Sequence, residues 1–406
     1  LYTEAYQLTK KPLYKQVIEE TIAFIETELA HPLGGFYAGK QGKSGKDPNF
    51  YLWTKKEAEA AIGNDMFAKI FCEYFNIKET GKYKNKNVLY VEKSDQAFLT
   101  EYGLTYSELE SMIYVCQQQL LKTRNKRIHP KLDFQVITAS NGIILKAYID
   151  AYRVLGHHTY LERANRLANF TSERLTLKND HLAHRLVNNK SIEKAFLDDY
   201  SYMIEAFITL YQADFNEKWL YKAKALGEDA INFFQNDEVG MFHYAVQQSD
   251  ASFLNNVQII DIEDSFMPSA NASIASGLFK LGLYFEKKEF TDIAKTMLAN
   301  VQNVMETTKT PTQYGEWGML YSHFVIEPYE VTIVGKDYGK LRSQWDSNFL
   351  PNVFLFGGNN EGTLTTLKGK FIEGETLIYV CKNKICKIPT SQVTEALAQI
   401  ETKKER

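Results

Sequence analysis

The sequence predicts a mainly α-helical protein, a toroid of helical hairpins over residues 1–325 followed by a small α/β tail over residues 326–406. Three observations predict this class. A helix-turn-helix pattern recurs along most of the chain, the two helices of each pair differ in polarity, and strand-like segments appear only near the end.

The recurring unit is an apolar helix that ends near an aromatic residue, a short polar turn, and a second helix that opens on an aromatic residue. Such a pair forms an antiparallel αα-hairpin. The first copy begins at Leu1 in what reads as the middle of a helix, so we expect its first helix to be truncated. The four copies span residues 4–25, 147–170, 210–233 and 281–301.

The two helices of a pair have different surfaces. The first is apolar on nearly all sides, whereas the second carries polar residues on one face, as residues 161–167 illustrate. An apolar helix should be buried and an amphipathic helix should lie at the surface, so the pattern predicts an inner and an outer ring. The repeat of roughly 55 to 75 residues is longer than that of the common solenoids, which favours a closed toroid.

Three of the expected inner helices open with small or polar residues. Free backbone amides and the helix dipole at such starts favour anionic or hydroxyl-bearing ligands. Because the inner helices of a toroid share a direction, we expect their starts to surround one central cavity. They lie at residues 138–142, 198–200 and 267–271.

The character of the chain changes after about residue 325. Residues 329–335 and 352–358 read as strands that end in glycine, with a helical stretch between them, and residues 376–381 read as a third strand. A final helix is expected over residues 391–400. These elements predict a small α/β tail on a helical body.

Composition excludes some classes of function. The 406 residues carry a net charge of −3, with 44% hydrophobic residues, so no broad charge favours nucleic acid or an anionic membrane. No apolar run is long enough to span a membrane, and no signal-peptide pattern is visible. We therefore expect no nucleic-acid partner and no membrane partner.

The four cysteines favour a reducing compartment, and we predict a cytoplasmic protein, because they are too few and too scattered for a secreted disulfide scaffold. Cys381 and Cys386 form no Cys-x-x-Cys motif and lack the further ligands that a structural zinc requires, so we interpret them as structural thiols. No convincing glycine-rich phosphate loop follows a strand. We expect neither a cofactor nor a bound metal.

Several motifs resemble those of a known family, and they occur in the family order over nearly the whole chain. They lie at residues 34–37, 50–53, 86–89, 132–133 with 141–142, 196–200, Asp264 with 268–271, and 379–381 through Cys386 to 389–390. The chain resembles the C-terminal helical region of the thioredoxin-domain-containing proteins related to spermatogenesis-associated protein 20. The resemblance implies an (α/α)6 toroid like those of the N-acylglucosamine 2-epimerases and six-hairpin glycosidases. It also implies a thioredoxin-like domain preceding this chain, which itself lacks one.

The chain departs from the family pattern where acidic groups are usual. Lys40, Gln41 and Lys43 replace an acidic loop, and Lys84 stands in place of a glutamate. Residues 133–135 and 139–142 also differ from the usual family sequence. Several groups that could have served acid/base chemistry are thus replaced.

The candidate catalytic groups are Asp199, Asp133 and Asp264. They lie at or near predicted helix starts that face the mouth of the central cavity. Hydrolysis of a glycoside needs two carboxyl groups on opposite sides of the bond. Asp198 and Asp199 diverge by about 100° on a helix, so a pair from different hairpins is more plausible than these neighbours. The plainer interpretation, that these carboxylates cap helices, stays open.

Other side chains are candidates for contacting a sugar. Aromatic rings offer apolar platforms, and amides or carboxylates orient hydroxyl groups, although aromatic residues at such spacing are more often part of a core. The candidate substrate-binding residues are Asp198, Tyr200, Asn141, Asn271, Tyr37, Trp53 and Trp317.

Two hypotheses of function follow. In the first, the chain is a carbohydrate-active protein of the glycosidase or sugar-epimerase type that binds a sugar-like small molecule in its central cavity. In the second, it is a divergent, catalytically inactive member that serves as a binding or scaffold module. An epimerase would use a histidine base, and His129, His243 and His323 could approach the mouth, but none lies in the motifs above.

Overall fold

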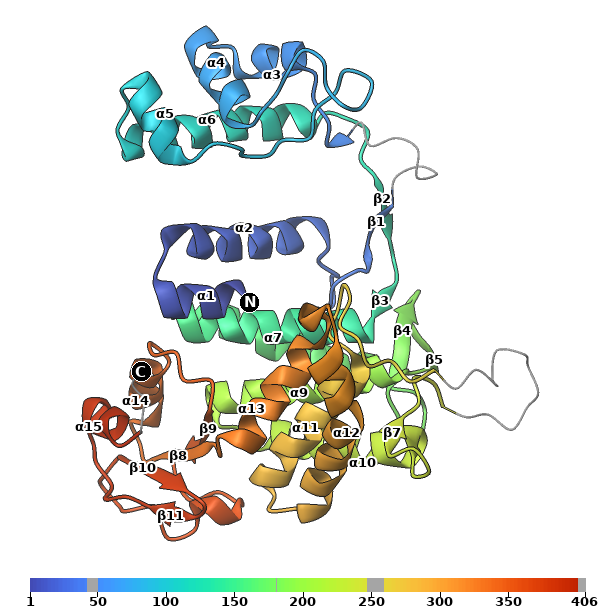
Figure 1. Ribbon diagram of the computed structural model, residues 1–406, viewed down its shortest axis with the longest axis vertical. Coiled ribbons are helices and arrows are strands. Elements are labelled where there is room, and N and C mark those ends of the chain that lie inside the picture. The colour runs from blue at the N-terminus through green and yellow to red at the C-terminus, as the bar shows by residue number, and fades with distance from the viewer. Residues whose placement is uncertain (42–49, 180, 247–258, 401–406) are drawn as a thin grey trace, which may run out of the picture. The chain divides into compact units, whose positions relative to one another are not determined.

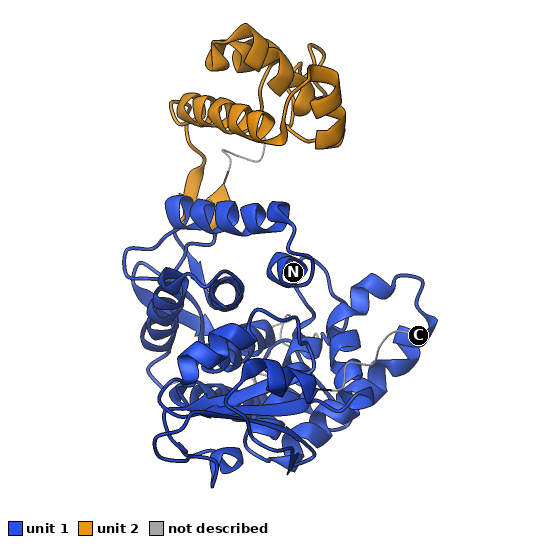
Figure 2. Ribbon diagram, turned by 90° about the vertical axis from the view of Figure 1, so that its left-hand side faces the viewer, with its two compact units in different colours: residues 1–38, 134–406 blue, residues 39–133 orange. Residues whose placement is uncertain are grey.

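The computed structural model describes residues 1–41, 50–179, 181–246 and 259–400. Lys43, one of the replaced loop residues, lies outside this part of the chain. The chain divides into two compact units (Figure 2): unit 1 comprises Leu1–Ala38 and Phe134–Arg406, and unit 2 comprises Gly39–Asp133. The expected boundary between toroid and tail at residue 325 lies within unit 1 and stays a prediction.

Unit 1 is built from helical hairpins (Figure 1). Each of the inner helices α1, α7, α9 and α11 packs on an outer partner and on the next inner helix, so that α1, α7, α9, α11 and α13 follow one another in space. The inner helices are α1 (Tyr2–Thr9), α7 (Thr138–Leu155), α9 (Leu197–Asp214), α11 (Ala270–Tyr284) and α13 (Gly315–Val325). The outer helices are α2 (Pro12–Glu28), α8 (His158–Arg174), α10 (Lys218–Phe234) and α12 (Lys288–Thr307).

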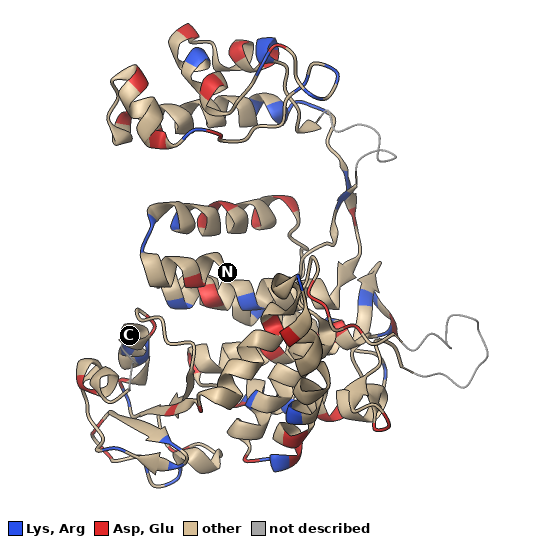
Figure 3. Ribbon diagram, viewed as in Figure 1, with Lys and Arg blue, Asp and Glu red and all other residues tan. Residues whose placement is uncertain are grey.

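The polarity pattern is confirmed by burial. Every residue of α9 from Leu197 to Ala213 is buried, whereas α8, α10 and α12 bury only one side. The predicted class, mainly α-helical hairpins with a small C-terminal α/β part, is confirmed. Charged residues of both signs are distributed over the helices of unit 1 (Figure 3).

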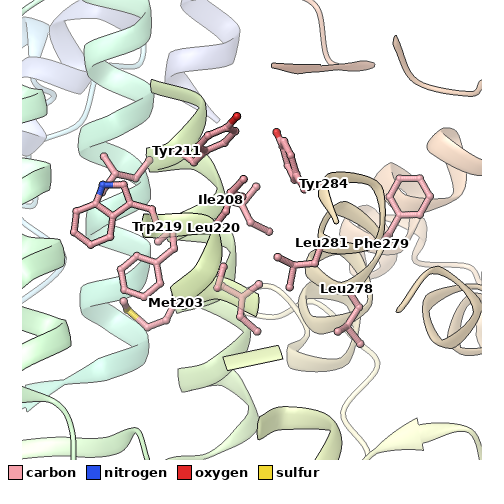
Figure 4. Packing of buried hydrophobic residues seen from close by; sticks show 14 of the residues in the cluster. Met203, Ile208, Tyr211, Trp219, Leu220, Leu278, Phe279, Leu281 and Tyr284 are labelled. Carbon is pink, nitrogen blue, oxygen red and sulfur yellow. The ribbon is translucent and has the colours of Figure 1, made fainter. Parts of the chain in front are cut away.

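The inner helices pack closely because small residues face their neighbours. A Cβ added at Gly142 of α7 would lie 3.1 Å from the backbone of Tyr202 on α9, and one at Gly277 of α11 would lie 2.8 Å from the side chain of Ile204. Apolar side chains of α9, α10 and α11 fill the space between them (Figure 4). The cores of neighbouring hairpins are therefore continuous.

Short strands connect or extend the hairpins. In unit 1, β3 (Val136–Ile137), β4 (Ala183–Val187) and β5 (Lys190–Lys194) form an antiparallel sheet in that order. A second small pair joins β6 (Gln235–Asn236) to β7 (Met241–Phe242). The 3-10 helix at Pro311–Tyr314 leads directly into α13.

The C-terminal part of unit 1 is a four-stranded sheet in the order β11-β10-β8-β9. Parallel β8 (Tyr329–Val334) and β9 (Val353–Gly358) are joined through α14 (Tyr338–Trp345), and antiparallel β10 (Leu377–Lys382) and β11 (Ile385–Cys386) follow. A 3-10 helix at Thr365–Leu367 and α15 (Val393–Ala398) complete this part.

The interpretation of Cys381 and Cys386 as thiols is wrong, because the structure joins them in a disulfide. The two residues are directly opposite each other in the β10–β11 hairpin. The tight turn at Asn383 and Lys384, rather than a metal or redox motif, brings the two sulfurs together.

Unit 2 has a core of its own, formed by residues such as Trp53, Phe71, Phe98 and Cys116. Its helices are α3 (Lys55–Ile62), α4 (Asp65–Tyr74), α5 (Asp95–Tyr102) and α6 (Tyr106–Arg124). Strands β1 (Gly39–Gln41) and β2 (Lys131–Asp133) pair at its ends. Among the helices described in both units, none combines the length and the apolar character that crossing a membrane requires.

Candidate functional site

Asp199 ties the starts of two inner helices together. Its side chain is fully buried in the first turn of α9. Oδ2 accepts a hydrogen bond from the amide of Phe196 at 2.9 Å, and Oδ1 accepts one from the amide of Ala139 on α7 at 2.8 Å. Nδ1 of His184, on β4, lies 2.8 Å from Oδ2. Both carboxylate oxygens are therefore engaged.

The pair formed by His184 and Asp199 is electrostatically coupled. Burial raises the pKa of Asp199, and the hydrogen bond from His184 opposes that rise. The same hydrogen bond raises the pKa of His184. The arrangement favours an imidazolium facing a carboxylate, and the His184 side chain, 20% exposed, is the more accessible partner.

Asp198 makes different contacts from its neighbour. Its Oδ2 accepts a hydrogen bond from the hydroxyl of Tyr244 at 3.0 Å, and its Oδ1 accepts one from the amide of Asp199 at 2.8 Å. Burial, followed by the charge of Asp199, raises the pKa of Asp198 to about 6. We call His184, Asp198, Asp199 and Tyr244 the mouth cluster.

Asn141 and Asn271 make equivalent hydrogen bonds to the backbone in two different hairpins. Oδ1 of Asn141 accepts from the amide of Phe36 at 2.9 Å, and its Nδ2 donates to the carbonyl of Phe36 at 3.0 Å. Asn271 makes the same two bonds to Phe242, both at 3.0 Å. Each buried amide thus holds the loop that follows an outer helix against the start of an inner helix.

Asp264 bridges the starts of α11 and α13. It accepts hydrogen bonds from the amides of Ser269 at 2.8 Å and Glu316 at 3.0 Å. Trp317, the next residue of α13, is fully buried and donates its indole N–H to the carbonyl of Ile262 at 3.0 Å. This part of the mouth is therefore braced by backbone hydrogen bonds.

The remaining predicted residues lie apart from these contacts. Tyr200 is buried against Phe234, and Tyr37 is half-buried with its ring edge-on to Phe134. Asp133 and Trp53 belong to unit 2, where Asp133 Oδ2 accepts a hydrogen bond from Gln41 Nε2 at 3.0 Å.

The histidines considered as bases are also dispersed. His129 belongs to unit 2, where it packs on Phe50. His243 is buried beside Asn236, and His323 stacks on Phe279 of α11. Two surface hollows, lined by residues such as Arg166 of α8 and Asp292 of α12, include none of these histidines or of the predicted site residues.

Sequence reasoning missed a group of charged side chains on the inner helices. Lys280 Nζ of α11 lies 2.6 Å from Glu205 Oε2 of α9, and Lys146 Nζ lies 2.7 Å from Asp150 Oδ2 within α7. Glu316 of α13 interacts electrostatically with both lysines and with Glu205. We call Lys146, Asp150, Glu205, Lys280 and Glu316 the inner-wall cluster.

Helical spacing places this cluster on the same faces as the mouth. Asp198, Tyr202 and Glu205 follow one another along one side of α9, as Gly142, Lys146 and Asp150 do along α7. The signal was present in the sequence, because each of Glu205 and Lys280 is a lone charge within an apolar helical stretch. Such a charge is costly to bury without a purpose or a partner.

The electrostatics of the cluster are unusual for buried helices. Burial, followed by the charge of Glu205, raises the pKa of Glu316 to about 7. Burial opposes the charge of Lys146, but the carboxylate of Asp150 dominates and raises its pKa. Glu205 Oε1 is buried and accepts no hydrogen bond within the described residues. The cluster therefore combines a readily protonated acid, two ammonium groups and an unpaired acceptor.

A metal centre is not evident in the part of the chain that the structure describes. No group of three or more His, Cys, Asp and Glu side chains there is placed to hold a metal ion. Glu205 and Asp150 of the inner-wall cluster instead form ion pairs with Lys280 and Lys146.

The predicted family resemblance is confirmed by comparison with known proteins, although no family model matches the chain. Human spermatogenesis-associated protein 20 is 22% identical over 444 residues, which cover 97% of this chain and 55% of that protein. An uncharacterized protein of Caenorhabditis elegans is 24% identical, covering 97% of this chain and 58% of its own length. The chain thus spans about half the length of the curated relatives that it matches.

Some solved structures share parts of the arrangement. A D-mannose isomerase has a TM-score of 0.38 and 15% identity, with 74% of this chain and 72% of that chain covered. The cellobiose 2-epimerase of Bacillus thermoamylovorans has a TM-score of 0.36 and 11% identity, with 71% of each chain covered. Likeness at this level carries no argument about the site.

Proposed function

We propose that unit 1 binds a polyhydroxylated, sugar-like small molecule against the inner-wall cluster and acts on it by acid/base chemistry. The observation that carries this proposal is Glu205. Its Oε2 is paired with Lys280, while its buried Oε1 has no hydrogen-bond donor among the described residues. An unsatisfied buried acceptor costs about 1–3 kcal/mol, so a ligand hydroxyl that donates to Oε1 would recover that cost.

The composition of the wall supports a ligand with several hydroxyl groups. Lys280 and Lys146 offer ammonium donors, and their side chains are 18% and 41% exposed. Asp150, 23% exposed, offers an acceptor. A hydroxyl group both donates and accepts, so neighbouring hydroxyls of a sugar can satisfy alternating carboxylates and ammonium groups.

Two carboxyl groups of the cluster suit the two roles that acid/base chemistry needs. The raised pKa of Glu316, about 7, makes this group a proton donor near neutral pH. Glu205 pairs with Lys280 through Oε2, and we propose it as the group that accepts a proton. The two come from different inner helices, α13 and α9, as catalysis by a facing pair requires.

The originally predicted acids take a supporting part in this proposal. Asp199 and Asp264 accept backbone hydrogen bonds with both of their carboxylate oxygens, so we assign them to bracing the helix starts. Asp198 keeps a raised pKa beside Tyr244, and we propose it as a contact for the ligand at the mouth.

The alternative is a binding or scaffold module without turnover. The observation that favours it is that both carboxylate oxygens of Asp199 and of Asp264 accept hydrogen bonds from backbone amides. In that case a sugar-like ligand still binds at the inner wall, but no product forms.

A thermal-shift screen with neutral sugars and sugar phosphates tests the proposal. We expect at least one sugar to raise the Tm of the wild-type chain and of Glu228→Gln, and not of Glu205→Gln. Glu228 is the matched control, because it pairs with Lys287 at 2.8 Å but lies exposed between outer helices. A shift that survives Glu205→Gln places the ligand elsewhere, and the absence of any shift contradicts a sugar ligand.

A turnover assay distinguishes the enzyme from the binding or scaffold module. With a sugar that binds, we expect product formation by the wild type and none by Glu316→Gln, whose ligand-induced shift should persist. Binding without product in the wild type would support the scaffold alternative instead.

A further inference from the structure

The disulfide of the C-terminal sheet has one accessible and one protected sulfur-bearing residue. Cys381 on β10 is 1% exposed, whereas Cys386 on β11 belongs to an exposed two-residue strand. A thiolate from solution can therefore approach Cys386 but not Cys381. This asymmetry defines which bond an incoming thiol would form.

The hairpin does not depend on this disulfide for its geometry. Asn383 and Lys384 connect the two strands with φ values of 53° and 63°, the conformation of a tight turn that suits the twist of a hairpin. The bridge spans a sequence separation of only 5, and a crosslink over so short a loop restricts the unfolded chain least. We therefore expect the disulfide to contribute little to the stability of the hairpin.

Lys370 provides a charge beside the protected sulfur. Its Nζ lies 3.5 Å from Cys381 Sγ and donates to Thr332 Oγ1 at 3.0 Å. Burial lowers the pKa of Lys370, and the charge of Glu330 on β8 opposes this. A thiolate released at Cys381 would meet an ammonium group already in place, which is what stabilises a leaving thiolate.

We propose that Cys381 and Cys386 form a thiol–disulfide exchange site that accepts electrons from an external dithiol of another protein. The partner's thiolate attacks Cys386 Sγ, a bond forms between these two sulfurs, and the Cys381–Cys386 bond breaks. The electron pair leaves on Cys381 as a thiolate held by Lys370. The partner's second thiolate then attacks its own bonded sulfur and releases Cys386. The partner becomes a disulfide, and its two thiol protons pass through solvent to the two cysteines.

The chain supplies its own internal controls. Cys72 and Cys116 of unit 2 are free and buried, and burial raises the pKa of each thiol to about 11. They should stay unreactive under native conditions. Lys382 of β10 is a matched control for Lys370, because it lies over the Tyr329 ring rather than beside a sulfur.

Reduction of the native full chain by dithiothreitol, followed by alkylation with N-ethylmaleimide and mass spectrometry, tests the proposal. We expect one added maleimide on the native chain, at Cys386, an unchanged far-ultraviolet circular dichroism spectrum, and labelling of Cys381, Cys72 and Cys116 only by a second alkylating agent that is added after denaturation. Resistance to dithiothreitol in the native state, or loss of structure on reduction, would overturn the proposal in favour of a structural bridge.

The role of Lys370 is tested at equilibrium with a dithiothreitol redox buffer. We expect Lys370→Met to lower the equilibrium constant for reduction by about tenfold, the effect of losing a hydrogen bond to a charged group, and Lys382→Met to leave it unchanged. Equal effects of the two variants, or none, would contradict the assignment.

The direction of attack is tested with single-cysteine variants. Cys381→Ser leaves an accessible thiol at Cys386, and we expect it to form a mixed disulfide with oxidised glutathione, whereas Cys386→Ser should react at least tenfold more slowly. Comparable rates for the two variants would contradict attack at Cys386.

Discussion

Two groups of acids on the same inner helix, α9, differ in how completely their oxygens are hydrogen bonded. In the mouth cluster, both carboxylate oxygens of Asp199 accept hydrogen bonds from backbone amides, and one of them also contacts His184. In the inner-wall cluster, Glu205 has one oxygen on Lys280 and one without a donor among the described residues. Both acids are buried, but only Glu205 retains capacity for a ligand.

The comparison shows that motif strength and functional capacity are different properties. The pair at residues 198–199 belongs to the most recognisable motif of the chain. Yet both carboxylate oxygens of Asp199 already accept hydrogen bonds from backbone amides of α7 and of the start of α9. Glu205 belongs to no motif, and its environment is incomplete. Hydrogen-bond satisfaction is therefore the better criterion for separating a bracing acid from a candidate ligand contact.

The largest effect is expected for Asp199→Asn. The amide removes the charge facing His184 and turns one acceptor into a donor that confronts a backbone N–H. We expect a loss of about 3–5 kcal/mol in the free energy of unfolding, measured in urea, because a buried hub loses its partners. Glu228→Gln should change it by less than about 0.5 kcal/mol. A small loss in Asp199→Asn would show that the mouth is not held by this acid.

The next effect concerns the two asparagine brackets. Asn141→Ala and Asn271→Ala each leave a buried phenylalanine amide and carbonyl without partners, so we expect each to cost about 2–3 kcal/mol in urea unfolding. Because the brackets lie in different hairpins, the double variant should show the sum. A strongly smaller sum would mean that the two loops support each other.

The pH dependence of Asp198 distinguishes the mouth from the wall. Its folded pKa of about 6 lies above the usual carboxyl value, so the folded state binds the extra proton. Stability from this group is full at low pH and falls as pH rises from about 4 to about 6, by up to about 2–3 kcal/mol. Relative to Asp198→Asn, the wild-type Tm should therefore decline over that range. A parallel course of both Tm values would contradict the raised pKa.

The smallest effect on stability is expected at the inner wall. Replacing the whole Glu205–Lys280 pair by Met in both positions removes two desolvated charges together. The free energy of unfolding should change by less than about 1 kcal/mol or rise, whereas any sugar-induced shift should disappear. A large loss of stability would show that the Glu205–Lys280 pair stabilises the fold, as the mouth cluster does, and would contradict a role in ligand binding alone.

Much of the fold could be predicted because its signals are local. The polarity difference within each hairpin, the starts of α7, α9 and α11, and the strands of the C-terminal sheet all follow from short stretches of sequence. The separate core of unit 2 was not predicted, since its helices carry no repeat of the hairpin pattern. Nor was the bridge at Cys381, which depends on the register of β10 and β11.

By itself, the sequence determined which segments form inner and outer helices and which acids stand at helix starts. Only the tertiary structure decided what those acids contact: Asp199 reaches Ala139 and His184, and Lys280 reaches back to Glu205. The physical reason is that helix formation depends on neighbouring residues, whereas the satisfaction of a buried charge depends on partners from other hairpins.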